Sequence, residues 1–342
     1  MNEATPPPNA DLRADRATLR DVARLAGVSE ISVSRVMRNA PNISDKLRDK
    51  VMEAANALGY TPNRVAGALK TASSRLVAVV VPSMSNEVFP EVLDGIDAVL
   101  SENGLSAVLG ISKYDRQREI AVVRELLSWS PMGLILTGLN ADPAIARMVQ
   151  AHGIPVVQIM DIDGDAIHSA VGISHAVAGA AAADHLLDRG YRRPGYIGAW
   201  GERPDRSRIR REAFERRLAD RGVSLHASRI LPGQSSTPLG SEALSDLLST
   251  HPDTDCVFFA NDDLAVGGLF HCLRAGIAVP DDLALLGFNG IAVASATPVK
   301  LTSISTQRYR MGTEAAQMLI AADANRPQRV DLGFSFTLGD ST

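Results

Sequence analysis

The 342-residue sequence has little of several patterns that define other classes of protein. It contains two cysteines, Cys256 and Cys272, which are too few for a disulfide framework. No apolar run approaches the roughly 20 residues that cross a membrane. No charged segment followed by an apolar one precedes the first helical pattern. We therefore expect a cytoplasmic protein with reduced thiols.

Motifs of catalysis are missing as well. The sequence has no P-loop, no nucleophile elbow and no glycine fingerprint that opens a helix after a strand. Its seven histidines are scattered without the spacing of metal ligands. The neighbouring acids Asp262 and Asp263 follow an apolar run, where they are better placed to cap a helix than to act as an acid and a base. We expect no enzymatic activity, no cofactor and no metal.

Charge is divided unevenly along the chain. Residues 16–75 contain 11 Lys and Arg against 5 Asp and Glu, a net charge of +6. Residues 76–342 contain 23 against 31, a net charge of −8. A basic segment ahead of an acidic remainder is typical of a local surface that binds nucleic-acid phosphates.

A helix-turn-helix is predicted within residues 17–60. Apolar residues recur at helical spacing after Thr18, after Ser29 and after Ser44, and each of these three residues can cap the helix that follows it. Gly27 permits the tight turn between the first two helices. The three apolar faces would bury one another in a small all-α core.

Polar side chains of the second helix face outward once its core positions are assigned. The first residues of such a helix enter the major groove of DNA, and Arg35 can contact guanine through its planar fork. Glu30 could accept a hydrogen bond from cytosine or repel wrong phosphates, and Ile31 could touch a thymine methyl group. The residues expected at DNA in this domain are Thr18, Ser29, Glu30, Ile31, Ser32, Ser34, Arg35, Arg38 and Asn42.

The segments GVSEISVSRVMR, NISDKLRDKV and LGYTPNRVAGALK closely resemble the lambda-repressor-like DNA-binding domain of the LacI/GalR family of bacterial repressors. In that family the segment that matches Pro62–Lys70 folds into a helix only on operator DNA, and a leucine at the position of Leu69 wedges into the minor groove. A segment this short is not a stable helix alone, so we expect residues 61–75 to be a hinge helix and linker. The hinge residues expected at DNA are Asn63, Arg64, Ala66, Leu69 and Lys70.

From residue 76 the pattern changes to apolar strands that alternate with amphipathic helices. We predict an α/β effector-binding domain with two doubly wound subdomains, similar to periplasmic sugar-binding proteins and to the effector domains of the LacI/GalR family. Residues 1–16 are predicted to be a disordered tail. The expected N-subdomain is about 76–173 and 305–328, and the expected C-subdomain is about 174–304 and 329–342.

Polar residues at the carboxyl ends of the strands are the candidates for ligand binding in such a fold. Arg206 and Arg210 lie four residues apart on one helical face and would suit a carboxylate, and the resemblance implies an effector contact at Arg210. Asn289 stands where many relatives have Asp, which would spare an anionic ligand one repulsion. The residues expected at the effector are Ser83, Asn86, Phe89, Tyr114, Asp161, Arg206, Arg210, Gln234, Ser235, Asn261 and Asn289, with a core or surface role equally open for Tyr114.

A narrower resemblance, to the gluconate repressors of this family, is carried by VPSMSNEVFPEVLDGI, CVFFANDDLAVGG and VPDDLALLGFNG. It implies a homodimeric repressor of sugar-acid catabolism that leaves a palindromic operator when a gluconate-like effector binds. Alternatives left open are 2-ketogluconate, 6-phosphogluconate or a neutral sugar as effector, and corepression in place of induction. A remote alternative function is a sugar-binding receptor without gene control. The cleft alone would permit it, but such a receptor has no use for a helix-turn-helix. The last predicted strand leads directly to Thr342 without a heptad extension, so we expect a dimer rather than a tetramer.

Overall fold

The computed structural model describes residues 17–38, 40–61, 74–199, 205–323 and 326–342. The chain divides into two compact units, one up to residue 72 and one from residue 73 onward. The tail predicted over 1–16 and most of the predicted hinge, residues 62–73, lie outside the described residues. No helix of the described chain has the length and apolar character needed to cross a membrane.

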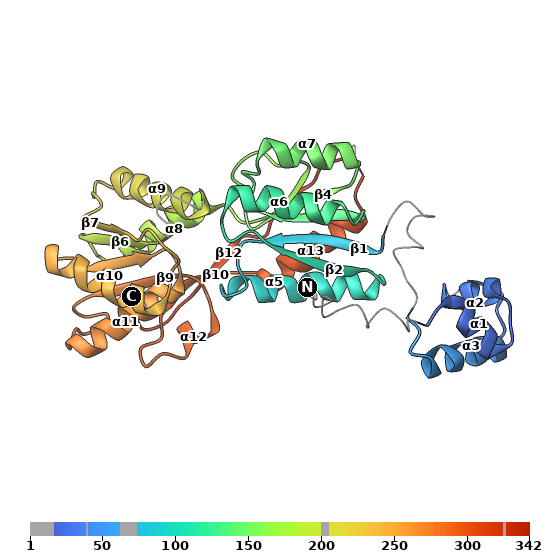
Figure 1. Ribbon diagram of the computed structural model, residues 1–342. Helices are drawn as coiled ribbons and strands as arrows, with labels where there is room; N and C mark the ends of the chain where they lie inside the picture. Colours follow the sequence, from blue (N-terminus) through green and yellow to red (C-terminus); the bar gives the residue numbers. More distant parts are fainter. Residues whose placement is uncertain (1–16, 39, 62–73, 200–204, 324–325) are drawn as a thin grey trace, which may run out of the picture. The chain divides into compact units, whose positions relative to one another are not determined.

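The first unit is a bundle of three short helices (Figure 1). They are α1 (Leu19–Ala26), α2 (Glu30–Met37) and α3 (Asp45–Ala57). The predicted caps are confirmed, because the side chains of Thr18, Ser29 and Ser44 each accept a backbone N–H of the first turn. One valine from each helix is fully buried in the common core, namely Val22, Val33 and Val51. The predicted helix-turn-helix is therefore present.

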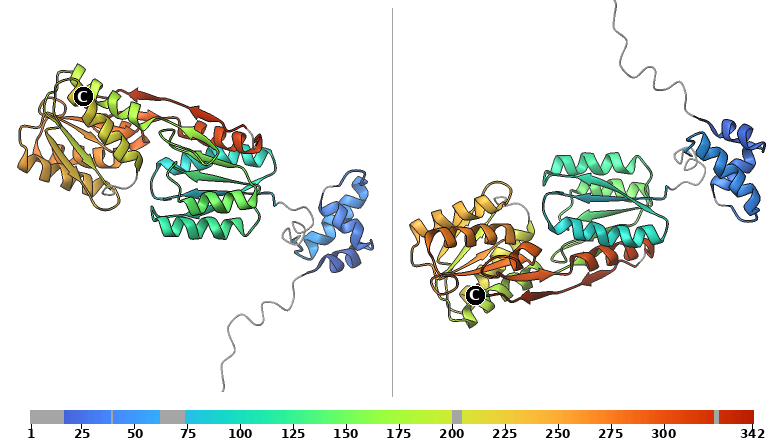
Figure 2. Two further views of the ribbon diagram at one scale, coloured as in Figure 1. Left: turned by 90° about the horizontal axis from the view of Figure 1, so that it is seen from above. Right: turned by 90° about the horizontal axis from the view of Figure 1, so that it is seen from below.

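The second unit contains two six-stranded sheets, each of which is the centre of one subdomain (Figures 1 and 2). The first sheet has the order β11-β5-β4-β3-β1-β2 and is parallel throughout, with β1 (Leu76–Val81), β2 (Ser106–Ile111), β3 (Gly133–Thr137), β4 (Val156–Ile159), β5 (Ser169–Gly172) and β11 (Arg329–Asp331). The second has the order β12-β10-β9-β8-β6-β7, with β6 (Pro194–Gly198), β7 (Ala227–Ile230), β8 (Cys256–Phe259), β9 (Ala284–Asn289), β10 (Thr302–Thr306) and the antiparallel edge strand β12 (Phe334–Thr337).

Helices cover both sheets in pairs and bury their apolar faces. Around the first sheet, one face packs against α5 (Val88–Glu102) and α13 (Arg308–Ile320), and the other against α6 (Arg116–Leu127) and α7 (Pro143–His152). Around the second sheet, α8 (His175–Asp188) packs with α9 (Asp205–Asp220), α10 (Thr237–Thr250) packs with α11 (Asp262–Ala275), and the short helix α12 (Ala292–Ser295) follows β9. The helices α8 and α9 approach closely at Gly179, where a Cβ atom would overlap the carbonyl oxygen of Arg210. The predicted doubly wound architecture is thus observed in both halves.

The described chain crosses between the two subdomains three times, after β5, after β10 and after β11. The first crossing lies between Gly172, which ends β5, and His175, which begins α8, and the second follows Thr306, which ends β10. The third corrects the prediction, because residues 329–331 form β11 beside β5 in the first sheet. A three-residue strand has too little apolar pattern to be recognised, and Arg329 holds it by donating to the carbonyls of Ile162 and Gly164.

Candidate functional site

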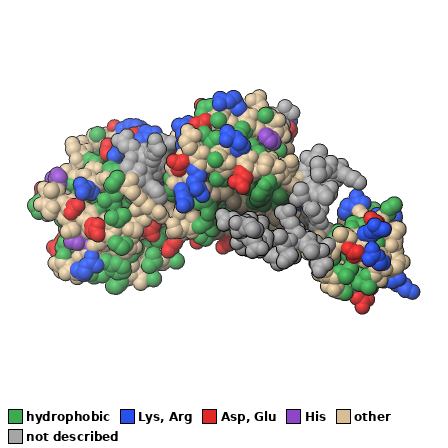
Figure 3. Space-filling model, viewed as in Figure 1, with side chains coloured by type: hydrophobic (Ala, Val, Ile, Leu, Met, Phe, Trp, Pro, Cys, Tyr) green, Lys and Arg blue, Asp and Glu red, His purple; other side chains and the backbone are tan. Residues whose placement is uncertain are grey.

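The exposed side of α2 carries the residues predicted to read DNA. Ile31 is 73% exposed although it is apolar, and Glu30, Arg35 and Arg38 are also exposed. Ser29 is used as the N-cap, and its hydroxyl also lies 2.9 Å from that of Ser32. Lys and Arg side chains gather on the visible face of this unit, with a few acidic ones among them (Figure 3). An exposed apolar side chain beside cations fits contact with both base edges and phosphates.

The remaining predicted DNA residues are placed as follows. Arg35 donates to the carbonyl of Pro41 at 3.3 Å, and Arg38 donates to the carbonyl of Ser34 at 3.2 Å, so both guanidinium groups lie close to the helix end. Asn42 adopts a left-handed backbone with φ 61°, which asparagine tolerates better than most residues. The predicted hinge contacts Asn63, Arg64, Ala66, Leu69 and Lys70 lie outside the described residues.

A cavity of about 60 Å³ lies between the two subdomains of the second unit, at the carboxyl ends of their strands. It brings together seven of the eleven predicted effector residues, namely Asn86, Phe89, Tyr114, Arg206, Arg210, Asn261 and Asn289. A second cavity of about 270 Å³ lies beside the first sheet and is lined by Asp161, and Tyr114 and Arg206 border both cavities. Ser83, Gln234 and Ser235 are not among the described residues that line either cavity.

Arg210 is the most unusual side chain of this site. Its residue is only 7% exposed, and burial lowers the pKa of the guanidinium to about 10, so the group stays charged near neutral pH. Nη1 donates to Nδ1 of His175 and Nη2 donates to the carbonyl of Ala260, both at 2.9 Å. The guanidinium carbon lies 3.8 Å from the ring centre of Phe288, and Nε has no hydrogen-bond partner within the part of the chain that the structure describes. Among the described residues, no ion pair includes Arg210.

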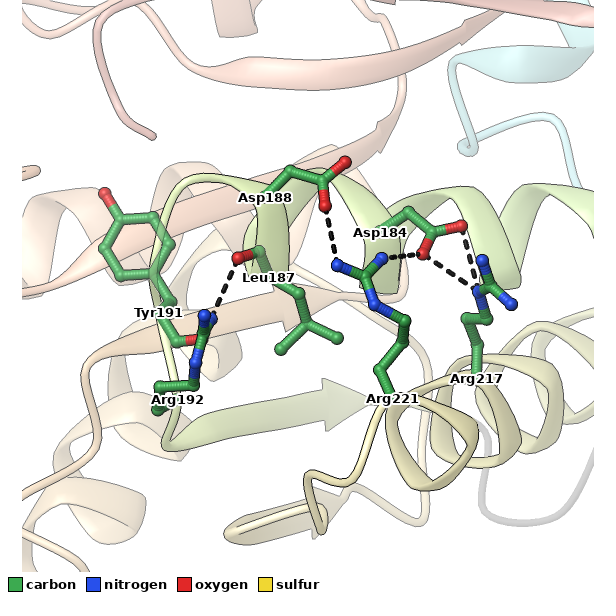
Figure 4. Close-up of polar contacts among 7 residues, drawn as sticks. All are labelled: Asp184, Leu187, Asp188, Tyr191, Arg192, Arg217 and Arg221. Carbon is green, nitrogen blue, oxygen red and sulfur yellow. Dashed lines mark hydrogen bonds and ion pairs between the residues drawn. The ribbon is translucent and has the colours of Figure 1, made fainter.

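The other arginines of α9 have a different environment. As Figure 4 shows, Arg217 and Arg221 of α9 reach Asp184 on α8, at 2.9 Å and 2.6 Å, and Arg221 also reaches Asp188. These hydrogen bonds, with Arg217 as the strongest contributor, hold the pKa of Asp184 below its ordinary value. Arg217 and Arg221 are both partly exposed to solvent. Arg210 and Arg206 lie on the same helix but line the cavity.

Among the cavity residues that were not predicted from the sequence, His175 and Phe288 contact Arg210. His175, the first residue of α8, donates from Nε2 to the carbonyl of Met160 at 2.9 Å and accepts from Arg210. Burial, with Arg210 nearby, holds the pKa of His175 well below its ordinary value. Phe288, in β9, faces both the His175 ring and the Arg210 guanidinium. In the sequence, a histidine at a helix start and a phenylalanine in a buried strand resemble ordinary packing residues. Only the structure shows that both contact Arg210.

The amides of the cavity are held by their own elements. Asn261 is the N-cap of α11, with its oxygen on the N–H of Leu264 and its NH₂ group 2.7 Å from the hydroxyl of Ser235. Ser235 is therefore a buried support for Asn261 rather than a lining residue. Asn289 ends β9 in a strained backbone with φ 114°, and its carbonyl accepts from Arg308.

Asp262 and Asp263 do not cap α11, contrary to the sequence prediction, because Asn261 takes that position. The carboxylate of Asp262 is fully buried and accepts from the hydroxyl of Ser303 at 2.7 Å and the N–H of Ile291 at 2.9 Å. It therefore fixes the turn after β9 that carries Asn289. A helix start one residue earlier than expected accounts for the difference.

Gln234, one of the predicted effector residues, forms a contact across the cleft instead. The hydroxyl of Ser85, which follows β1, accepts from Nε2 of Gln234, which follows β7, at 3.0 Å. Ser83 lies behind this contact, with its hydroxyl 3.0 Å from that of Ser85. These three side chains connect the two subdomains at the edge of the cleft.

Comparison with known proteins covers both units of the chain. A family model described as bacterial regulatory proteins of the lacI family matches residues 18–63, and one described as a periplasmic binding protein-like domain matches residues 183–342. The HTH-type transcriptional regulator GntR of Pseudomonas aeruginosa is 43% identical over 331 residues, which are 96% of each chain. The chain belongs to the LacI family.

Further LacI-family proteins support the same assignment. The HTH-type transcriptional regulator GntR of Escherichia coli K12 is 36% identical over 96% of this chain and 100% of that protein. The crystal structure of a LacI-family transcriptional regulator from Silicibacter pomeroyi has 40% identity and a TM-score of 0.89, over 95% of this chain and 99% of that one. This LacI-family chain is thus a transcriptional regulator close to the GntR members, as its sequence predicts.

Proposed function

We propose that this LacI-family protein represses genes of sugar-acid catabolism and that gluconate or a related sugar acid in the cleft releases it from DNA. The observation that carries the effector class is Arg210, a buried cation whose hydrogen-bond partners are neutral. A ligand carboxylate would supply the missing counter-ion, and charge-assisted hydrogen bonds of this kind are about twice as strong as neutral ones. The resemblance to gluconate repressors supports the same class of ligand.

The rest of the cleft suits the polyol part of such a ligand. Asn86, Asn261 and Asn289 present amides, which can both donate to and accept from hydroxyl groups. Arg206, one turn before Arg210, lines the cavity as a second cation. Asn289 adds no negative charge that would repel a carboxylate.

Release from DNA would follow from a change in how the two subdomains pack. We propose a homodimer that places two copies of α2 on a near-palindromic operator, with the hinge residues Asn63, Arg64, Ala66, Leu69 and Lys70 on the DNA between them. Contacts of Ile31 and Arg35 would read bases, and the surrounding cations would bind phosphates. An effector that prefers one packing of the subdomains would then couple the cleft to the hinge, by roughly 1–3 kcal/mol.

The decisive experiment is isothermal titration of the purified protein with gluconate, 2-ketogluconate, 6-phosphogluconate and a neutral hexose. We expect saturable binding of a sugar acid and much weaker binding of the hexose, because only the acid neutralises Arg210. The same sugar acid should release operator DNA in a fluorescence anisotropy assay. Binding of the hexose with none of the acids bound would overturn the sugar-acid effector, and unchanged operator binding would overturn induction.

A further inference from the structure

Among the described residues, the groups in direct contact with Arg210 are neutral, and the carboxylate of Asp161 acts on its charge from a greater distance. His175 and the Ala260 carbonyl accept its two terminal nitrogens, and the ring of Phe288 lies against its face. The cation is thus fixed before any ligand arrives. A fixed arginine loses less side-chain freedom on binding, and this favours affinity.

The protonation of His175 follows from these contacts. A guanidinium only donates hydrogen bonds, so Nδ1 of His175 must accept and carries no hydrogen. The ring hydrogen is then on Nε2, which donates to the carbonyl of Met160. His175 is therefore a neutral acceptor, 3% exposed, that binds the guanidinium without cancelling its charge.

We propose that His175 is a positioning residue that orients Arg210 without forming an ion pair with it, and thereby makes the cleft select a carboxylate over an uncharged sugar. This proposal rests on the proposed function and adds the residue that sets the charge selectivity. A carboxylate at position 175 would orient Arg210 equally well but would occupy and neutralise it. The ligand acid would then meet a closed ion pair in place of a free cation.

His175 also makes a second contact, to the carbonyl of Met160, which could give it a purely structural role. Its bond to Met160 connects the start of α8 with the residue that follows β4, across the first crossing between the subdomains. Loss of that hydrogen bond would disturb the fold and so weaken the binding of any ligand, charged or neutral. The ratio of two affinities separates the two roles, because a fold defect weakens both ligands and a charge effect weakens only the acid.

The test compares His175→Asn with His175→Asp, which have nearly the same size and both offer an oxygen acceptor to Arg210. Binding of gluconate and of its neutral amide, gluconamide, is measured by isothermal titration for both variants and the wild type. We expect His175→Asn to keep the wild-type preference for gluconate within about threefold. We expect His175→Asp to lower that preference by about tenfold or more, which corresponds to about 1.4 kcal/mol.

Thermal unfolding and operator binding of each variant show whether it folds. If His175→Asp fails to fold, His175→Leu replaces it: removal of the acceptor should weaken gluconate binding more than gluconamide binding, and His175→Asn should restore it. Equal preference for gluconate in the Asn variant and in the Asp or Leu variant would overturn the role of His175 and leave the proposed effector intact. A wild type that binds gluconate no better than gluconamide would overturn the sugar-acid effector itself.

Discussion

At the scale of single residues, the sequence identifies Arg210 but not what makes it special. Its spacing from Arg206 and the family resemblance both indicate a ligand contact. Burial, the neutral partners and the absence of an ion pair among the described residues depend on α8 and β9, which are distant in sequence. His175 was missed for the same reason, since its function lies in a contact 35 residues away.

Arg210→Met is expected to weaken gluconate binding by about 1.5–3 kcal/mol, the value of hydrogen bonds to a charged group. Methionine keeps much of the apolar volume against Phe288 while it removes the charge. Isothermal titration measures the loss, and operator affinity should stay at the wild-type level. Loss of both affinities with a lower Tm would instead identify Arg210 as a folding residue.

Arg217→Met is the matched control on the same helix. Arg217 pairs with Asp184 at the partly exposed side of α9, away from the cavity. Its replacement should leave gluconate affinity unchanged within about twofold and cost roughly 0–1 kcal/mol of stability. A large loss of affinity in this variant would contradict the division of α9 into a ligand side and a solvent side.

At the scale of elements, helix caps and apolar periodicity can be predicted from the sequence, but the close approach of two helices cannot. Thr18, Ser29 and Ser44 cap helices where local sequence places them. The contact of α8 with α9 depends on Gly179 and on the face of α9 that packs against this glycine. The sequence of one helix alone does not contain both facts. The edge strand β11 escaped prediction because its pairing with β5, and not its own pattern, makes it a strand.

Gly179→Ala should move α9, because the new methyl group would overlap the carbonyl of Arg210. Overpacking of this kind costs typically about 1–3 kcal/mol, and here it would also shift the backbone that carries Arg210. We expect a lower Tm by calorimetry together with weaker gluconate binding. Gly233→Ala is the control, since a Cβ atom there meets no neighbour within 4 Å. Wild-type gluconate affinity in Gly179→Ala would show that Arg210 does not depend on this helix contact.

At the scale of the whole molecule, the basic unit and the acidic unit are separate compact bodies. If effector and operator compete through the coupling proposed above, the effect must be reciprocal. Gluconate should weaken operator binding by a factor of roughly 5–150, and saturating operator should weaken gluconate binding by the same factor. Anisotropy titrations of labelled operator and calorimetric titrations with gluconate give the two factors. Two clearly unequal factors would rule out a single coupled equilibrium.

The three crossings between the subdomains also determine when each half is complete during synthesis. The first sheet receives α13 and β11 only from residues 308–331, after all strands of the second sheet except β12 have been made. A nascent chain therefore leaves the part of the first sheet that α13 covers exposed until residues 308–331 have been made, although α5 on the same face is already present. The usual order, in which the N-terminal domain folds first, is not available to these two halves. Both subdomains, and the cleft between them, therefore reach their final form only after the strands β11 and β12 have been made.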